Sequence, residues 1–103
     1  MTFIVVVSYP HKPEARFDID HYVNVHMPHV SKIWGPVGLR SWAVTQPIDP
    51  EYVIQAVVTW ESMEAWKTAS QGPEAKGIFD DVPKFTNLDP LIVKGGVLSS
   101  WKA

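Results

Sequence analysis

Two segments, residues 3–7 and Tyr52–Trp60, place the strongest constraint on the fold of this chain. Successive side chains of a β-strand point to opposite faces of its sheet, and both segments carry apolar side chains on both faces. A sheet built from such strands must be covered on each side. The chain has 103 residues, and domains commonly have about 100 to 150, so we interpret residues 1–103 as a single domain.

Four segments in all have the composition of strands. They are rich in β-branched and other apolar residues. They are residues 2–8, Leu39–Thr45, Tyr52–Trp60 and residues 90–98. We expect the second and third to form a hairpin, and we expect Gly95 and Gly96 to introduce a bulge or bend in the last.

The first helix is predicted to begin after Asp18, whose side-chain oxygen can accept hydrogen bonds from the free N–H groups of the first turn. It is expected to end near Gly35 and Pro36. Between these points, residues of one helical face recur with the helical period. They are Ile19, Tyr22, Val23, His26, Val30 and Ile33.

The second helical region is shorter and is interrupted. Ser62 can cap a helix that turns Met63, Trp66 and Ala69 inward. Gly72 and Pro73 then interrupt the helix, and a second helical piece is expected to run to about residue 80.

The predicted order is strand, helix, strand, strand, helix, strand. This is the ferredoxin-like βαββαβ plan, an α+β fold with a four-stranded antiparallel sheet and both helices on one face. Two helices cover one face of the sheet, yet the strands are apolar on both. A second copy of the sheet is the simplest cover for the other face, so we expect a homodimer.

Composition excludes several classes of function. Nine Lys and Arg against eleven Asp and Glu give a formal charge of −2, and the basic residues are scattered, so we expect no nucleic-acid partner. The absence of cysteine excludes disulfides and cysteine metal sites. No apolar run approaches the roughly 20 residues of a membrane span, so no membrane association is expected and a cytoplasmic protein is the default.

The stretch NVHMPHV, residues 24–30, carries the most unusual pattern. His26 falls on the apolar stripe of the first helix, and Pro28 follows it. Because proline has no N–H, it leaves the carbonyl of Asn24 without its helical partner, and the kink can open a gap between helix and sheet at His26. His26 is then either a general acid or base in a pocket, or a buried histidine bonded to a backbone carbonyl.

Three blocks of the sequence resemble the EthD family. In residues 17–30, Phe17, Tyr22 and the His26-Met27-Pro28 triplet match the family motif of the first helix. Residues 58–66 are similar to its strand-to-helix transition. In residues 79–87, an aspartate followed four residues later by a phenylalanine matches a third signature.

The resemblance departs from the family pattern in two places. His29 replaces an apolar residue after Pro28, and Trp60 with Glu61 replaces a more usual aromatic pair.

The resemblance implies that the ferredoxin-like chain pairs into a dimeric α+β barrel. The EthD family takes its name from a gene cluster for degrading ethyl tert-butyl ether, in which its own role was left undefined. Relatives of this fold include cyclases, isomerases, small monooxygenases and haem proteins, so the fold alone does not decide the chemistry.

Several side chains are candidates for a site in this fold. We predict His26 as the catalytic acid or base, with Tyr22 one turn earlier to orient it or to donate to an oxyanion. Residues expected to line the ligand are His11, His29, Trp60, Phe79 and Phe85. The aromatic ones are more typical of core, and Asp81 is interpreted as a structural turn residue.

No metal or cofactor is expected. His21 and His26 are five residues apart and should point to different sides of an α-helix, and no carboxylate-rich pattern completes a ligand set. Nothing in the sequence specifies haem.

The resulting hypothesis is a protein of small-molecule catabolism that binds a small, hydrophobic, oxygenated compound between the sheet and the first helix. If it is an enzyme, cofactor-independent proton-transfer chemistry of the isomerase, cyclase or lyase type suits a single histidine. The alternative is a non-catalytic carrier or accessory protein for a neighbouring oxygenase system.

Overall fold

The computed structural model describes residues 1–103 as one antiparallel sheet with helices on one side. Its strands are β1 (Phe3–Pro10), β2 (Leu39–Thr45), β3 (Tyr52–Trp60) and β4 (Leu91–Gly96). Its helices are α1 (Ile19–His21), η1 (Tyr22–His26), α2 (Met27–Trp34), η2 (Gly35–Val37), α3 (Met63–Ser70), α4 (Ala75–Asp80) and α5 (Val82–Phe85). The strand order is β2-β3-β1-β4 with every pair antiparallel, which confirms the predicted ferredoxin-like α+β fold.

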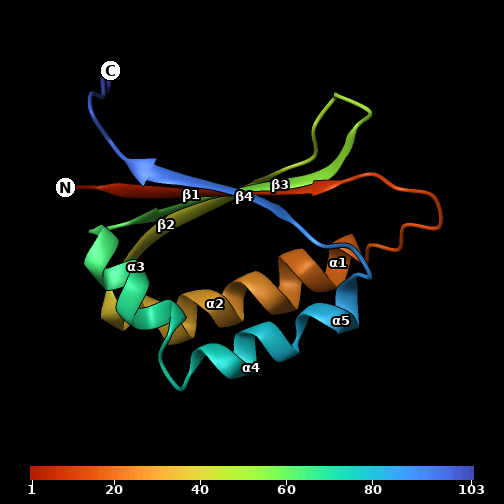
Figure 1. Cartoon of the computed structure of the whole chain (residues 1–103), viewed down its shortest axis with the longest axis horizontal. Helices are drawn as coiled ribbons and strands as arrows, with labels where there is room; N and C mark the ends of the chain where they lie inside the picture. The colour runs from red at the N-terminus through yellow and green to blue at the C-terminus, as the bar shows by residue number, and fades with distance from the viewer.

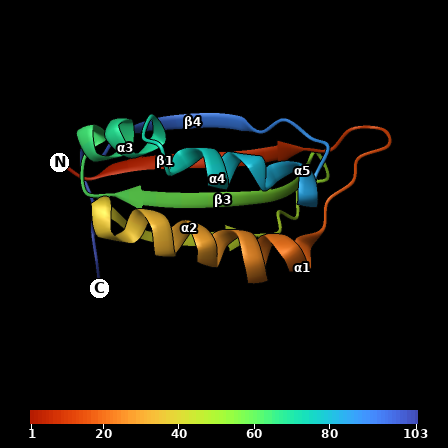
Figure 2. The same cartoon turned by 90° about the horizontal axis from the view of Figure 1, so that it is seen from below.

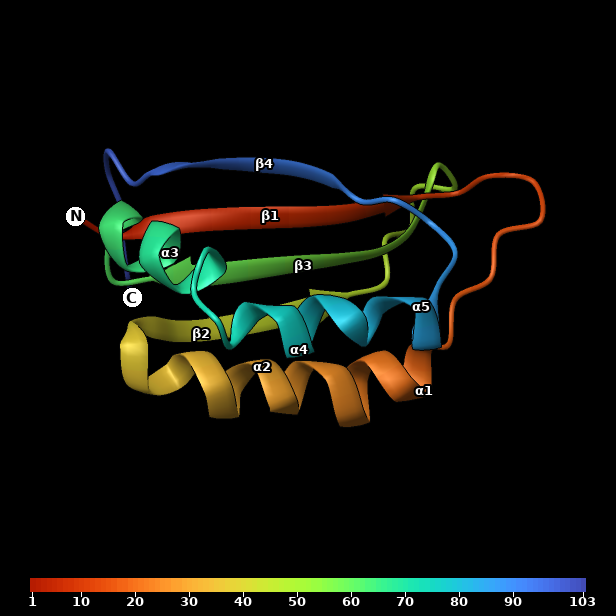
Figure 3. The ribbon, with the colours of Figure 1, turned by 60° about the horizontal axis from the view of Figure 1, so that its bottom comes forward.

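The molecule has two layers (Figure 1). All the helices lie on one side of the sheet, and no helix covers the other side. Figure 3 shows α2 running along the β2 side of the sheet, with α4 and α5 beside it and α3 in front of the ends of β1 and β3. No helix is long and apolar enough to cross a membrane.

The strand registers correct one expectation. Gly95 pairs with Ile4 and Gly96 with Phe3, and the β1–β4 register continues without a shift, so the predicted bulge in β4 is wrong. Register shifts occur instead in β1, between Tyr9 and Pro10, and in β2 near Leu39. Strand β1 also extends two residues beyond the predicted end.

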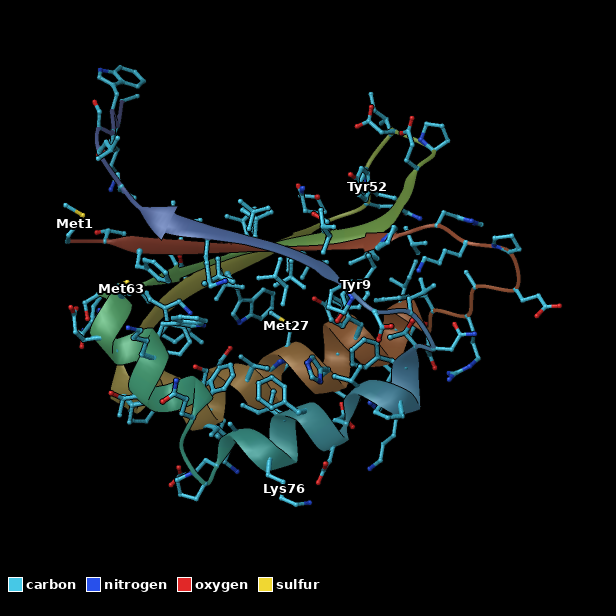
Figure 4. All side chains as sticks on the ribbon, viewed as in Figure 1. Met1, Tyr9, Met27, Tyr52, Met63 and Lys76 are labelled. Carbon is cyan, nitrogen blue, oxygen red and sulfur yellow. The ribbon has the colours of Figure 1, made fainter.

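The core lies between the sheet and the helices. Alternate residues of β3 are buried, as the strand period requires. The most completely buried large side chains are Trp60, Phe85 and Ile54. Figure 4 shows Tyr9 and Met27 in the space between the two layers, while Lys76 points outward from α4.

Both predicted helix caps are present. The side chain of Asp18 accepts from the N–H of His21, and that of Ser62 accepts from the N–H of Ala65. Met63 was predicted to face inward, but 43% of its side chain is exposed. It is the first residue of α3, at the end of the helix layer in Figure 4.

The open face of the sheet has no charged side chain. Lys94 lies over the ring of Trp66 on the helix side, so its neighbours on β4 point to the open side. The alternation of the four strands then places these residues on the open face: Ile4, Val6, Ser8, Ser41, Ala43, Thr45, Val53, Gln55, Val57, Thr59, Leu91 and Val93. The two-sided apolar pattern of β1 and β3 therefore corresponds to one buried face and one open face.

Candidate functional site: a carboxylate shared by two histidines

The first helix contains a wide turn where the sequence predicted a proline kink. Residues Tyr22–His26 form a π-helix, in which the N–H of Met27 donates to the carbonyl of Tyr22, five residues earlier. The α-helix resumes at Met27, with Pro28 in its first turn. π-Helical turns are rare in proteins, and those that do occur often lie at functional sites.

The π-helix brings His21 and His26 onto the same carboxylate. The Nδ1 atom of His26 lies 2.9 Å from Oδ2 of Asp81, and Nε2 of His21 lies 3.0 Å from the same oxygen. The prediction that the two histidines point to different sides is wrong, because five residues at about 100° each separate side chains by about 140° only in a regular α-helix. In the wider π-helical turn both side chains reach the same carboxylate, that of Asp81.

Asp81 also differs from its predicted role as a turn residue. It lies at the junction of α4 and α5, and its side chain is only 15% exposed. Lys84, one turn later, approaches its other oxygen at 3.9 Å. The carboxylate thus lies under the first helix with two histidine donors and one distant lysine.

Contacts between distant segments hold this arrangement in place. Phe17 and Thr86 form an isolated antiparallel bridge immediately before α1 and after α5. The N–H of Asp18 donates to the carbonyl of Phe85 at 2.7 Å, and the hydroxyl of Thr86 donates to the carbonyl of Arg16 at 2.7 Å. Because these bonds fix the start of the first helix against the end of α5, they place both histidines opposite Asp81.

Burial and the shared carboxylate set the protonation states. Burial lowers the pKa of His26 below its ordinary value of 6.5, and this outweighs the opposite effect of the hydrogen bond to Asp81. Burial alone would raise the pKa of Asp81, but the hydrogen bonds and charges of the two histidines together hold it below its usual range. Near pH 7 the pair is therefore a neutral imidazole beside an ionised carboxylate.

This pairing fixes the tautomer of His26. An ionised carboxylate only accepts hydrogen bonds, so Nδ1 of His26 carries the proton and Nε2 carries a lone pair. The Nε2 atom makes no hydrogen bond in the structure and is not among the fully buried unpaired atoms, of which Trp34 Nε1 is the one example. A histidine held this way can accept a proton at Nε2 while Asp81 stabilises the resulting cation.

Aromatic rings enclose His26. The ring of Tyr22 is stacked on it at 5.6 Å between centroids, and that of Phe85 lies at 4.7 Å. Tyr9 contacts both Tyr22 and Phe85 from the sheet. Burial raises the pKa of Tyr9 to about 12 and raises that of Tyr22 further, so both hydroxyls stay protonated and can only donate or accept hydrogen bonds.

These side chains fill the region where a gap was expected. Tyr22 is 2% exposed, Phe85 is fully buried, and Met27 and Val30 are buried next to them. Pro28 lies in the first turn of α2, directly after the π-helix, and Met27 beside it is buried in the core. The helix therefore stays packed against the sheet at this point. The predicted binding residue Phe85 therefore lies at His26, within the packed rings.

A surface depression of about 560 Å³ adjoins the shared carboxylate. It lies between the first helix and the α4–α5 segment, whose helices run side by side in Figure 2. Only one of its seven lining residues, Val25, is hydrophobic, and the others are Asn24, His29, Gly77, Asp80, Asp81 and Lys84. Asp81 belongs to both the depression and the histidine pair, so it connects the solvent side with His26.

The remaining predicted residues occupy different places. His29 lines the depression, whereas His11 is exposed in the loop after β1, where its backbone N–H donates to the backbone carbonyl of Glu51. Trp60 is buried at the end of β3 opposite Phe3, far along the strand from Tyr9. Phe79 is 54% exposed and contacts Trp34.

Sequence reasoning missed His21 and the bonding role of Asp81. The usable signal for Asp81 was its place in the third EthD-like block, four residues before Phe85. No group of three or more His, Cys, Asp and Glu side chains is arranged to hold a metal ion. The contacts of Asp81 with its two histidines are hydrogen bonds between ring nitrogens and the carboxylate.

Comparison with known proteins identifies the fold. No family model and no curated protein matches the sequence. The structure is similar to that of an EthD-like protein from Ralstonia eutropha JMP134, with a TM-score of 0.86 and 23% identity, over 97% of this chain and 95% of that one. This chain has the EthD-like fold.

Two further structures extend the comparison. An EthD family protein from Bacillus halodurans C-125 matches with a TM-score of 0.72 and 23% identity, over 95% of this chain and 100% of that one. SnoaB, a cofactor-independent oxygenase from Streptomyces nogalater, matches with a TM-score of 0.64 and 9% identity, over 96% and 93%. The resemblance read from three sequence blocks is thus confirmed at the level of the EthD-like fold.

Proposed function

We propose that this protein is an EthD-like protein of small-molecule catabolism that binds a small oxygenated organic compound at His26. The observation that carries the proposal is the 2.9 Å bond between Asp81 and His26 Nδ1, which leaves Nε2 as a free acceptor among aromatic rings. Such an atom suits an enolisable compound, whose acidic C–H or O–H proton it can accept.

The surroundings suggest how the ligand is oriented. Tyr22 and Phe85 offer apolar ring surface, while the adjoining depression offers Asn24, His29 and Lys84. We propose that the oxygen atoms of the ligand face this depression and that its apolar part displaces or slides between the rings at His26. A purely hydrophobic ligand would leave the polar groups of Asn24, His29 and Lys84 without partners, whereas an oxygenated one can bond to them.

The chemistry we propose is proton transfer without a cofactor. His26 Nε2 takes a proton from the carbon next to a carbonyl, the carbonyl oxygen becomes an enolate oxygen, and the same nitrogen returns the proton at another position or to a leaving group. Asp81 stabilises the imidazolium formed in between. Isomerisation, cyclisation and elimination all consist of such steps.

We also propose that two copies pair through their open sheet faces into a dimeric α+β barrel. The open face carries apolar and small polar side chains but no charge, although it is uncovered in the single chain. Large contiguous apolar patches on a protein surface mark protein–protein contact sites.

Native mass spectrometry with deuterium exchange tests the site. The protein is incubated with a panel of enolisable aromatic ketones and hydroxy-acids, and retained compounds are weighed. We expect retention in the wild type and in His11→Ala, a control in an exposed loop, and loss of retention in His26→Ala. Retention that survives His26→Ala would contradict the site.

Exchange in heavy water then separates an enzyme from a carrier. The proposal predicts that the wild type speeds the exchange of the acidic C–H of a retained compound and that Asp81→Asn slows this exchange at least ten-fold. Retention without any accelerated exchange would support the non-catalytic carrier instead.

A further inference from the structure

The C-terminal residues 97–101, here called the arm, leave β4 on the open side of the sheet (Figure 1). In Figure 2 the chain end lies beyond β3 and α2, on the opposite side of the molecule from β4. The N–H of Val97 donates to the carbonyl of Thr2 at 2.9 Å, which fixes the start of the arm beside β1. The arm therefore has a defined direction and crosses the open side.

The arm carries two large apolar side chains that contact little of their own chain. Leu98 is 95% exposed and Trp101 is 86% exposed. A tryptophan can bury about 150 to 250 Å², so this exposure leaves a large apolar surface in water.

A depression of about 590 Å³ lies where the arm meets the open face. Its apolar lining comes from the sheet, through Ile4, Val6 and Val93, and from the arm, through Val97 and Leu98; Lys94 also lines it, although its ammonium lies over Trp66 on the helix side. The depression is open, so an apolar side chain from another molecule can enter between arm and sheet. Each copy thus carries both a projecting apolar arm and an apolar recess.

We propose that the arm of one copy docks on the open sheet face of a second copy, with Leu98 and Trp101 as its anchors. The inference rests on the sheet-to-sheet pairing proposed above and adds the element that holds it. Recess and arm are present on every copy, so a two-fold arrangement uses both arms at once.

The size of the sheet supports a role for the arm in addition to the paired sheets. Four strands about 4.8 Å apart, with about seven residues rising 3.3 Å each, present a flat patch of roughly 450 Å². Stable interfaces bury about 800 Å² per partner. The projected patch is modest beside this figure, and an arm with an exposed leucine and tryptophan adds apolar area to it.

The charge pattern favours a second copy over a membrane. Helices and arms that bind membrane surfaces combine apolar residues with several Lys or Arg. Alternation places no charged side chain of β1, β3 or β4 on the open face, and residues 97–103 contain the single basic residue Lys102. A neutral face is complementary to an identical neutral face.

Sedimentation velocity over a range of protein concentrations tests the arm. The variants are Trp101→Ala and a chain that ends at Val97, and the control is Met63→Ala, which removes an apolar side chain exposed on the helix layer. We expect the wild type and the control to be dimeric, and the dissociation constant of the dimer to rise at least ten-fold in both arm variants.

Two results would overturn the proposal in distinguishable ways. If both arm variants form a dimer as tight as that of the wild type, the arm has no role in the dimer, but the sheets can still pair. If the wild type is a monomer at all concentrations, both the proposed pairing of sheets and the docking of the arm are wrong. Acrylamide quenching of tryptophan fluorescence gives a second readout. The emission of Trp101, identified by its loss in Trp101→Phe, should be protected from acrylamide in the dimer. A Trp101 that acrylamide quenches freely in the dimer would contradict the docking.

Discussion

His26 and Asp81, which are 55 positions apart in the chain, are joined by a hydrogen bond of 2.9 Å between Nδ1 and Oδ2. The side chain of His26 is 8% exposed and that of Asp81 is 15% exposed. A buried imidazole with one nitrogen held by a carboxylate has its other nitrogen prepared as a base.

Asp81→Asn is expected to lower stability by about 1 to 3 kcal/mol, because it removes a charged acceptor from two partly buried donors. Urea denaturation measures the change. The matched control is Asp80→Asn, since Asp80 is 61% exposed and pairs only with Lys76 on the surface. Exposed pairs contribute little, so the control should stay within about 0.5 kcal/mol of the wild type.

Stability is expected to fall as the pH drops below His26's ordinary pKa of 6.5. The folded pKa of His26 is lowered by burial, so the unfolded chain binds the proton first and stability rises with pH across this range. Asp81 acts in the same direction at lower pH, because its folded pKa is also lowered and its contribution is lost as the carboxylate is protonated.

Urea midpoints at several pH values between about 4 and 8 check this dependence. The slope near pH 6 should shrink in His26→Ala and persist in His11→Ala. An unchanged slope in His26→Ala would show that other groups cause the dependence.

Gly38→Ala is expected to destabilise the fold by about 2 kcal/mol or more. Gly38 has a φ of 122° at the entry to β2, and an added Cβ would lie 2.7 Å from the Cβ of Ala65. Gly77→Ala is the opposite case, because nothing lies within 4 Å of its added Cβ and it sits inside α4. It should stabilise by up to about 1 kcal/mol, and thermal melts compare the two.

Much of the fold could be predicted because its signals are local. The apolar strands, the caps at Asp18 and Ser62 and the turn residues each depend on neighbours in sequence. Gly95 and Gly96 gave a misleading signal, because β4 is an edge strand whose pairing with β1 tolerates glycine without a bulge. Met63 was misplaced because a first-turn residue can point past the edge of the core.

The site was only half predictable for a physical reason. His26, Tyr22 and Phe85 could be found from the stripe and the EthD-like blocks, and the structure brings their rings together. His21 was assigned to another face with α-helical geometry, which a π-helix does not follow. The meeting of Asp81 with the first helix depends on tertiary contacts such as Phe17 with Thr86, which no local pattern specifies.

The ¹⁵N NMR spectrum of the His26 imidazole, followed as a function of pH in the wild type and in Asp81→Asn, tests the proposed base directly. We predict a neutral ring at pH 7 with the proton on Nδ1, a titration below 6.5, and loss of the fixed tautomer in the variant. A ring that is protonated on Nε2 at pH 7, or one that titrates above 6.5 in the wild type, would contradict the free base on which the proposed chemistry depends.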